Sequence, residues 1–176
     1  EYAAVEDFGI PIVDDAAQAF GSVSSHHGFI AALSFYPTKI IGGAGDGGMV
    51  LCSNQTLSNE VRALGSHGAV SSGGSKRVQG HVAGNSRLDA IQAAVILAQL
   101  PDLKRRIHER RQIATLYNSV LGKYALKRAV SSNVSVYSFR HPRRDQIRSE
   151  LISLGIQTAI YYPTPISKNP ILDKQF

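Results

Sequence analysis

The most restrictive feature of this sequence is the seven-residue run from Gly42 to Gly48, in which five residues are glycine. It follows the segment Ser34 to Lys39, which contains a proline, almost directly, and it precedes the apolar run Met49 to Cys52. Glycine lets the backbone bend tightly and approach a neighbour closely, whereas proline stiffens the turn that contains it. The sequence therefore predicts a stiff lysine-bearing turn, a glycine loop and then a strand.

Residues 43–48 match the pattern Gly-x-Gly-x-x-Gly, which is typical of dinucleotide-binding loops. That function requires a strand before the glycines and a helix after them. Here a turn precedes the glycines and an apolar strand follows them. We therefore reject a dinucleotide site and interpret the glycines as a means of close backbone approach.

Lys39 is the candidate reactive residue of this segment. A lysine amine attacks a carbonyl carbon only when it is deprotonated, so a catalytic lysine needs surroundings that disfavour the ammonium form. A proline-stiffened turn beside a glycine loop offers such surroundings. The ordinary alternative is a surface lysine in a loop.

Hydrophobic and helical patterns predict a series of short elements along the chain. The predicted elements are a helix end at 2–8, a buried strand at 10–13, strands at 30–35 and 49–52, helices at 57–64, 86–100, 103–124 and 143–154, an extended segment at 131–141 and a strand at 156–162. Gly9 and Gly155 are placed at left-handed positions after helices. Residues 65–84 are predicted to be a long loop that carries part of a site.

The helix after this loop has a sequence signal at each end. Ser86 and Asp89 form a predicted capping pair, and Pro101 marks the end. Its predicted inward face consists of Leu88, Ile91, Val95 and Ala98. We predict an α/β fold in which residues 1–100 are the last part of a large α/β domain, and residues 101–176 are a connecting helix and an incomplete small α+β domain.

Positive charge is concentrated in the second half of the chain. Residues 1–100 hold five Lys and Arg against eight Asp and Glu, whereas residues 101–150 hold twelve against four. Such a surplus could attract nucleic acid, a nucleotide diphosphate or an acidic protein surface. Apolar residues recur at helical spacing between the charges, and no nucleic-acid motif accompanies them, which favours a solvated basic face on a packed helix.

Several classes of protein and site are excluded by what the sequence lacks. It has no apolar run long enough to span a membrane and no secretion signal, so we expect a cytoplasmic protein that does not bind membranes. The histidines lack the spacing of zinc ligands, so no metal site is expected. Cys52, the one cysteine, is interpreted as a buried strand thiol. Because the first residue is Glu1, we expect the chain to begin inside a larger protein.

Asp14 and Asp15 follow a predicted strand, and Gln18 lies three residues beyond Asp15. Ligands of α/β sheets sit at the carboxyl ends of the strands, and only one of two successive residues can face a common ligand. Asp15 could equally cap a following helix. An acid at a strand end, a lysine in a turn and a glycine loop together suit pyridoxal phosphate, whose ring nitrogen is kept protonated by a carboxylate.

Four ordered motifs carry a resemblance to a known family. They are Asp15-Ala-Ala-Gln-Ala19, Ser34-Phe-Tyr-Pro-Thr-Lys39, Gly45-Asp-Gly-Gly48 and Gly84-Asn-Ser-Arg-Leu-Asp89. Together they resemble the DegT/DnrJ/StrS family of sugar aminotransferases, and the likeness continues through Gln92-Ala-Ala94 to Tyr161-Tyr-Pro-Thr-Pro165. The resemblance implies a pyridoxal-phosphate-dependent transferase of fold type I, with a mostly parallel sheet between helices.

The resemblance also implies a role for each candidate site residue. Lys39 would hold the cofactor as a Schiff base and then move a proton, Asp15 would pair with the ring nitrogen, Gln18 would contact the ring hydroxyl, and Ser34 would bind the phosphate. Asn85 would reach the phosphate in a neighbouring subunit, which implies a homodimer with shared sites. The alternative for Asn85 is helix capping beside Ser86.

The reaction implied by the resemblance moves an amino group from L-glutamate to a keto group of a nucleotide-linked sugar. Lys39 argues against the dehydrating relatives, which carry histidine there. Two alternatives remain open. The chain could be a non-catalytic fragment or decayed paralogue of the family, or a basic module that binds nucleic acid through residues 104–148.

Overall fold

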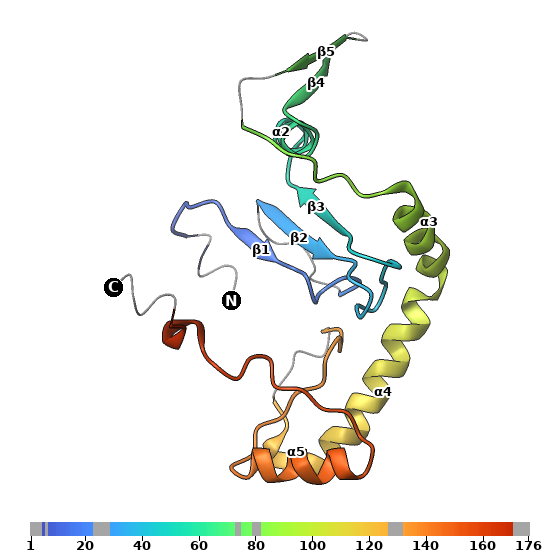
Figure 1. Ribbon diagram of the computed structural model, residues 1–176, viewed down its shortest axis with the longest axis vertical. Coiled ribbons are helices and arrows are strands. Elements are labelled where there is room, and N and C mark those ends of the chain that lie inside the picture. Colours follow the sequence, from blue (N-terminus) through green and yellow to red (C-terminus); the bar gives the residue numbers. More distant parts are fainter. Residues whose placement is uncertain are drawn as a thin grey trace. The chain divides into compact units, whose positions relative to one another are not determined.

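The computed structural model shown in Figure 1 describes residues 5, 7–22, 29–72, 75–78, 82–126 and 132–170. The chain divides into two compact units, Glu1–Ser138 and Phe139–Phe176. The predicted helix end at 2–8 lies largely outside the described residues, and Gly9 has a φ of +64°, as expected for the left-handed position. The boundary between domains at residue 100 stays a prediction.

A three-stranded sheet forms the centre of the first unit, in the order β1-β2-β3. Its strands are β1 (Val13–Asp15), β2 (Ile30–Ser34) and β3 (Gly48–Cys52). β1 runs parallel to β2, with Asp15 opposite Ala32, whereas β3 runs antiparallel to β2, with Gly48 opposite Ser34. The strands predicted at 30–35 and 49–52 are confirmed.

The first strand differs from its prediction in position and in burial. Regular pairing covers Val13–Asp15 rather than residues 10–13. Ile10 is 67% exposed and Val13 is 70% exposed, so the expected burial is wrong for this chain. Within the described residues β1 pairs on one side only, with β2, and no element covers the side chains of Ile10 and Val13.

α2 (Gln55–Leu64) follows β3 and confirms the helix predicted at 57–64. Asn54 caps it, because its side-chain oxygen accepts the Leu57 N–H at 2.9 Å. The long loop predicted at 65–84 is wrong in part, since β4 (Ala69–Ser72) and β5 (Ser75–Val78) form an antiparallel hairpin. Backbone pairing holds such a hairpin, and its serine-rich sequence lacks the apolar alternation that marks a half-buried strand.

α3 (Ala90–Gln99) continues through a 3-10 turn (Leu100–Asp102) into α4 (Leu103–Leu121), and a further 3-10 turn covers Gly122–Tyr124. Asp89 alone caps α3, accepting the Ile91 N–H at 2.8 Å, whereas the Ser86 N–H donates to the Gly65 carbonyl. The predicted capping pair is therefore wrong.

The inward face predicted for α3 is also wrong in part. Ile91 is 72% exposed, whereas Ile96 is 5% exposed. The face that meets the rest of the unit contains Gln92, Ile96 and Gln99, which recur at helical spacing. Two of these three residues are polar. The prediction relied on the positions of apolar residues and therefore placed the neighbouring face inward.

The core consists of two adjoining clusters. The larger contains Phe35, Ile40 and Ile41 packed against Ile96 of α3 and Ile107 of α4. The smaller contains Ala16 with Ala31 and Leu33 of β2. Phe20 packs against both clusters, and its ring meets that of Phe35 edge-on at 5.3 Å between centroids.

Residues 35–47, here called the lysine loop, connect β2 to β3 and include the Lys39 turn. The Phe35 N–H donates to the Gly47 carbonyl and the Phe35 carbonyl accepts the Gly43 N–H, both at 2.8 Å. The Lys39 N–H donates to the Tyr36 carbonyl at 2.9 Å. A Cβ at Gly42 would lie 2.7 Å from the carbonyl oxygens of Tyr36 and Pro37, so the predicted close backbone approach is confirmed here.

In the second unit, α5 (Arg144–Ser153) confirms the predicted helix, and Gly155 has a φ of +77°. The strand predicted at 156–162 is wrong, because these residues have no regular secondary structure. The residues described at 132–141 likewise contain no strand. A strand requires a neighbouring strand, and the sheets formed by the described residues include none at 156–162. A 3-10 turn covers Ile166–Lys168.

No helix among the described residues combines the length and the apolar character that a membrane span requires.

Replacement of Ile41, which is 1% exposed, by alanine is expected to lower the free energy of unfolding by about 2–5 kcal/mol, because it opens a cavity in the larger cluster. Ile91→Ala is the matched control, and it is expected to change stability by less than about 0.5 kcal/mol because Ile91 is mostly exposed. Urea unfolding measures both. Equal losses would contradict the observed orientation of α3.

Gly42→Ala is expected to destabilise the chain by about 1–3 kcal/mol, because the new Cβ meets two backbone carbonyl oxygens that cannot move independently. Gly84→Ala is the control, since a Cβ there meets nothing within 4 Å. Thermal unfolding compares the two. A tolerated Gly42→Ala would show that the turn at Tyr36 and Pro37 is looser than described.

Asp89→Ala is expected to cost about 1 kcal/mol of stability because it removes the N-cap of α3. Ser86→Ala is expected to be neutral, since the hydroxyl plays no part in the cap. Urea midpoints of the two variants distinguish the observed single cap from the capping pair, in which both substitutions would be harmful.

Candidate active site

Two of the candidate residues lie at one edge of the sheet, and a third lies in the loop that leaves it. β1 and β2 are parallel, so Asp15 and Ser34, the last residues of the two strands, lie at the same edge. The lysine loop leaves β2 at this edge and carries Lys39 five residues beyond Ser34. Carboxyl ends of neighbouring parallel strands are where ligands of α/β folds bind.

Asp15 is exposed and has a local bond to the turn that follows it. Its Oδ1 accepts the Ala17 N–H at 3.2 Å, which fixes one oxygen of the carboxylate. In the alternative interpretation Asp15 was expected to cap a following helix. Residues 17–21 form turns instead of a helix. Gln18 lies exposed in this turn, close in sequence to the sheet edge.

Ser34 and Lys39 are both partly buried. Ser34 Oγ accepts the Tyr36 N–H at 3.3 Å, a bond that leaves the hydroxyl hydrogen for another acceptor. Lys39 follows Tyr36, which is 51% exposed, and precedes Ile40, which is 4% exposed. The lysine is therefore at the point where the loop passes from the surface into the core.

Asn85 is placed by a different part of the unit. Its backbone pairs with Ser66 in an isolated antiparallel bridge, and its Oδ1 accepts the Arg87 N–H at 3.4 Å and Nε–H at 3.0 Å. It does not cap α3, because Asp89 does, so the capping alternative is wrong. None of the described contacts joins Asn85 to the sheet edge, and its role toward a neighbouring subunit stays a prediction.

Three side chains that the sequence analysis assigned no role hold the lysine loop in place. Gln92 Oε1 accepts the Gly45 N–H at 3.0 Å, and Gln99 Nε2 donates to the Gly42 carbonyl at 2.6 Å. Arg106 Nη1 donates to the Ile40 carbonyl and to Gln99 Oε1, each at 3.1 Å. The available signal was the spacing of Gln92 and Gln99 on one helical face with Ile96 between them.

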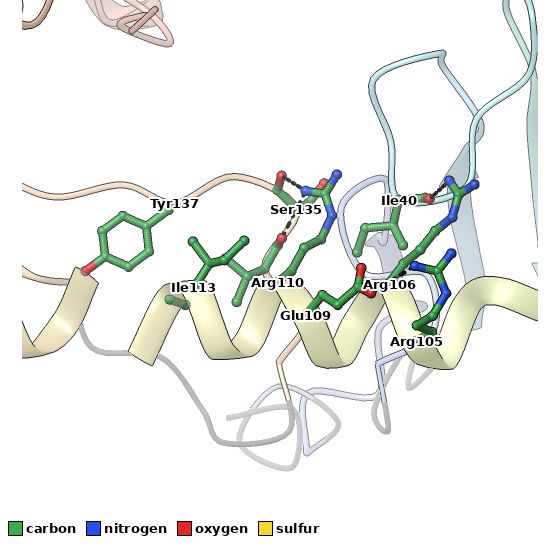
Figure 2. Close-up of a pocket in the computed structure, with 10 residues that line it drawn as sticks. Ile40, Arg105, Arg106, Glu109, Arg110, Ile113, Ser135 and Tyr137 are labelled. Carbon is green, nitrogen blue, oxygen red and sulfur yellow. Dashed lines mark hydrogen bonds and ion pairs between the residues drawn. The ribbon is translucent and has the colours of Figure 1, made fainter. Parts of the chain in front are cut away.

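The basic face of α4 is engaged within the unit, beside a pocket of about 510 Å³ (Figure 2). Arg105 pairs with Glu109 at 2.9 Å and with Asp102 at 3.1 Å. Hydrogen bonds to these carboxylates raise the pKa of Arg105, and the bond to Glu109 has the larger effect. Arg110 donates to the Ser135 carbonyl at 3.0 Å, and Arg111 donates to that of Ser132 at 3.2 Å. These bonds favour a structural role for the basic face.

A second hollow, of about 1010 Å³, lies over β3 and α2. Its lining includes Asp46, Met49, Arg62 and Arg87. None of the candidate site residues lines either hollow.

The sequence profile of the DegT/DnrJ/EryC1/StrS aminotransferase family matches residues 3–176. The chain is 32% identical over 180 residues to the UDP-2-acetamido-2-deoxy-3-oxo-D-glucuronate aminotransferase of Pseudomonas aeruginosa, covering 96% of this chain and 48% of that protein. It is 33% identical over 177 residues to the pleiotropic regulatory protein of Geobacillus stearothermophilus, covering 93% and 46%. The chain thus spans about half the length of these curated relatives.

Solved structures agree with the family profile. The S. venezuelae protein DesV, in complex with a ketimine intermediate, matches with a TM-score of 0.85 and 32% identity over 99% of this chain and 49% of that one. A DegT DnrJ EryC1 StrS aminotransferase from Brucella abortus matches with a TM-score of 0.84 and 31% identity over 98% and 48%. The predicted fold class is confirmed, and the chain belongs to the DegT/DnrJ/EryC1/StrS aminotransferase family.

Proposed function

We propose that this chain is part of a pyridoxal-phosphate-dependent aminotransferase that moves an amino group from L-glutamate to a nucleotide-linked keto-sugar. The observation that carries the proposal is that Asp15 and Ser34 end neighbouring parallel strands at the edge from which the Lys39 turn departs, in a chain that belongs to an aminotransferase family. The parallel pairing of β1 and β2 produces this juxtaposition from residues distant in sequence.

The groups at this edge fit the cofactor chemically. Pyridoxal phosphate offers an aldehyde, a ring nitrogen and a phosphate, and the edge offers an amine, a carboxylate and a hydroxyl. When bound, the cofactor supplies an electron sink for charge that develops at the substrate carbon. Lys39 Nζ would bind the aldehyde carbon and later take and return the proton at the substrate carbon.

Asp15 and Ser34 would bind the cofactor through atoms whose local bonds are known. The Ala17 N–H fixes Asp15 Oδ1, so the carboxylate is oriented before it holds the proton on the ring nitrogen. Ser34 accepts from Tyr36 and can donate its hydrogen to a phosphate oxygen. Gln18 would contact the ring hydroxyl, and Asn85 would bind the phosphate of a partner subunit in a homodimer.

The substrate class is supported by the names of several relatives. One is a UDP-2-acetamido-2-deoxy-3-oxo-D-glucuronate aminotransferase, and another, from Streptomyces venezuelae, is a dTDP-3-amino-3,4,6-trideoxy-alpha-D-glucose transaminase that is 34% identical over 92% of this chain. Both names describe amino transfer on nucleotide-linked sugars. L-glutamate as the donor follows from the family resemblance.

A non-catalytic role is the second candidate, and two relatives favour it. The names pleiotropic regulatory protein and erythromycin biosynthesis sensory transduction protein EryC1 describe regulation rather than catalysis. A regulatory member can retain the fold without the chemistry, so a covalent test of Lys39 separates the two candidates.

The test is reduction with borohydride after incubation with pyridoxal phosphate, followed by peptide mapping. We expect one dominant label, on Lys39, and none at this position in Lys39→Arg, because reduction makes the lysine–aldehyde bond permanent. Lys104→Arg is the control, since Lys104 is exposed on α4, and it should leave the label unchanged. L-glutamate added before reduction should remove the label and release 2-oxoglutarate.

Labels spread over exposed lysines such as Lys104 and Lys123, with none favoured, would contradict the Schiff-base site. A label on Lys39 that L-glutamate does not remove would retain the cofactor site and contradict the donor.

A further inference from the structure

The lysine loop is attached to the body of the unit on the side that follows Lys39. Ile40 and Ile41 are 4% and 1% exposed and lie in the larger core cluster. The carbonyls of Ile40 and Gly42 face α4 and α3 and accept hydrogen bonds from them. Figure 2 shows Arg106 extending from α4 to the Ile40 carbonyl.

Gln99 and Arg106 form one bonded unit. Arg106 can only donate, so it requires the oxygen of the Gln99 amide, and the Gly42 carbonyl can only accept, so it requires the nitrogen. Both requirements are met by the same amide orientation, with distances of 3.1 Å and 2.6 Å. Gln99 Nε2 also donates to the Val95 carbonyl at 3.2 Å, which ties the amide to its own helix.

The apolar contacts of Ile40 and Ile41 attach the loop without fixing its direction, because hydrophobic burial is non-directional. Charge-assisted hydrogen bonds from a planar guanidinium add direction. Arg106 acts on the carbonyl of the residue that directly follows Lys39. This carbonyl belongs to the peptide unit between Ile40 and Ile41, so its displacement moves the backbone directly after Lys39 and, through Ile40, the lysine Cα.

We propose that Gln99 and Arg106 are positioning residues for Lys39, because they hold the backbone that directly follows it, in the loop that leaves the carboxyl end of β2. The inference rests on the proposed function for its catalytic meaning, because a reacting amine must be held within a fraction of an ångström of its target. Its structural content, the fixed loop, stands on the hydrogen bonds alone.

Two substitutions with matched controls test the proposal on the 176-residue chain. Gln99→Glu retains an oxygen for Arg106 and places a second oxygen against the Gly42 carbonyl, where a donor is needed. Its control is Gln112→Glu, since Gln112 is exposed on α4. Arg106→Ala removes the bond to Ile40, and Arg105→Ala removes a neighbouring guanidinium whose pairs are with Asp102 and Glu109.

Three measurements are made on each variant: the thermal midpoint, amide hydrogen exchange along the chain, and the rate at which pyridoxal phosphate and borohydride label Lys39 relative to Lys104. We expect Gln99→Glu and Arg106→Ala to exchange faster at the amides of Lys39 and Gly43 while the amides of α4 stay protected. Labelling of Lys39 should fall about tenfold to a hundredfold, as for a misplaced reacting group, and labelling of Lys104 should not change. Both controls should match the parent chain.

Three outcomes would overturn the proposal. The first is loop exchange and Lys39 labelling equal to those of the controls. The second is faster exchange throughout α3 and α4 together with the loop, which indicates a purely structural role. If Arg106→Ala fails to fold, Arg106→Lys replaces it, because lysine lacks the guanidinium but retains a donor. The third outcome is labelling and exchange in Arg106→Lys equal to those of the parent chain, which would show that the guanidinium does not position the loop.

The proposed function can fail separately. If the parent chain shows no preferential label on Lys39, the Schiff-base role falls, and faster exchange confined to the loop in the variants still supports the positioning of Lys39. If the parent is labelled and the variants are unchanged, the proposed function stands and the positioning role falls.

Discussion

Burial of Phe35, Ile40 and Ile41 is the interaction on which the first unit depends. These side chains are at most 4% exposed, and α3 and α4 meet the sheet region through them. Each fully buried side chain of this size contributes about 1.5–3 kcal/mol relative to an exposed one. They flank Lys39 on both sides in sequence, so the segment that carries the candidate reactive residue also forms the core. Any change that loosens this core also displaces Lys39.

A loop drawn into a core brings its backbone polar groups with it, and these groups need partners. The carbonyls of Ile40 and Gly42 face the helices, and the donors come from Arg106 and Gln99. Glycine at position 42 permits the backbone to pass within contact distance of the Tyr36 and Pro37 carbonyls. The positive charge of Arg106 on α4 thus supplies a donor to a carbonyl of the lysine loop, which explains how a helix of basic composition packs against the core.

Much of the local structure follows from the sequence. The strands at 30–34 and 48–52, the helices at 55–64 and 144–153 and the position of Gly9 agree with the spacing of apolar, capping and turn residues. Such features depend on residues within a few positions of one another, and their propensities act locally. The hairpin at 69–78 escaped prediction because backbone pairing, rather than side-chain pattern, holds it.

The sequence by itself determined the motifs of the family, the lysine turn with its glycine loop, and the elements whose patterns are local, such as β2, β3, α2 and α5.

 Tertiary structure decided the rest: which face of α3 is buried, which strand residues stay exposed, and which side chains hold the lysine loop. Gln99 and Gly42 are separated by 57 residues, and Arg106 and Ile40 by 66, so no local pattern links them. The physical reason is that the burial and the hydrogen bonds of a side chain depend on which other element packs against it. The spacing of residues along the chain indicates only whether that side chain lies on a helix or a strand, and on which face.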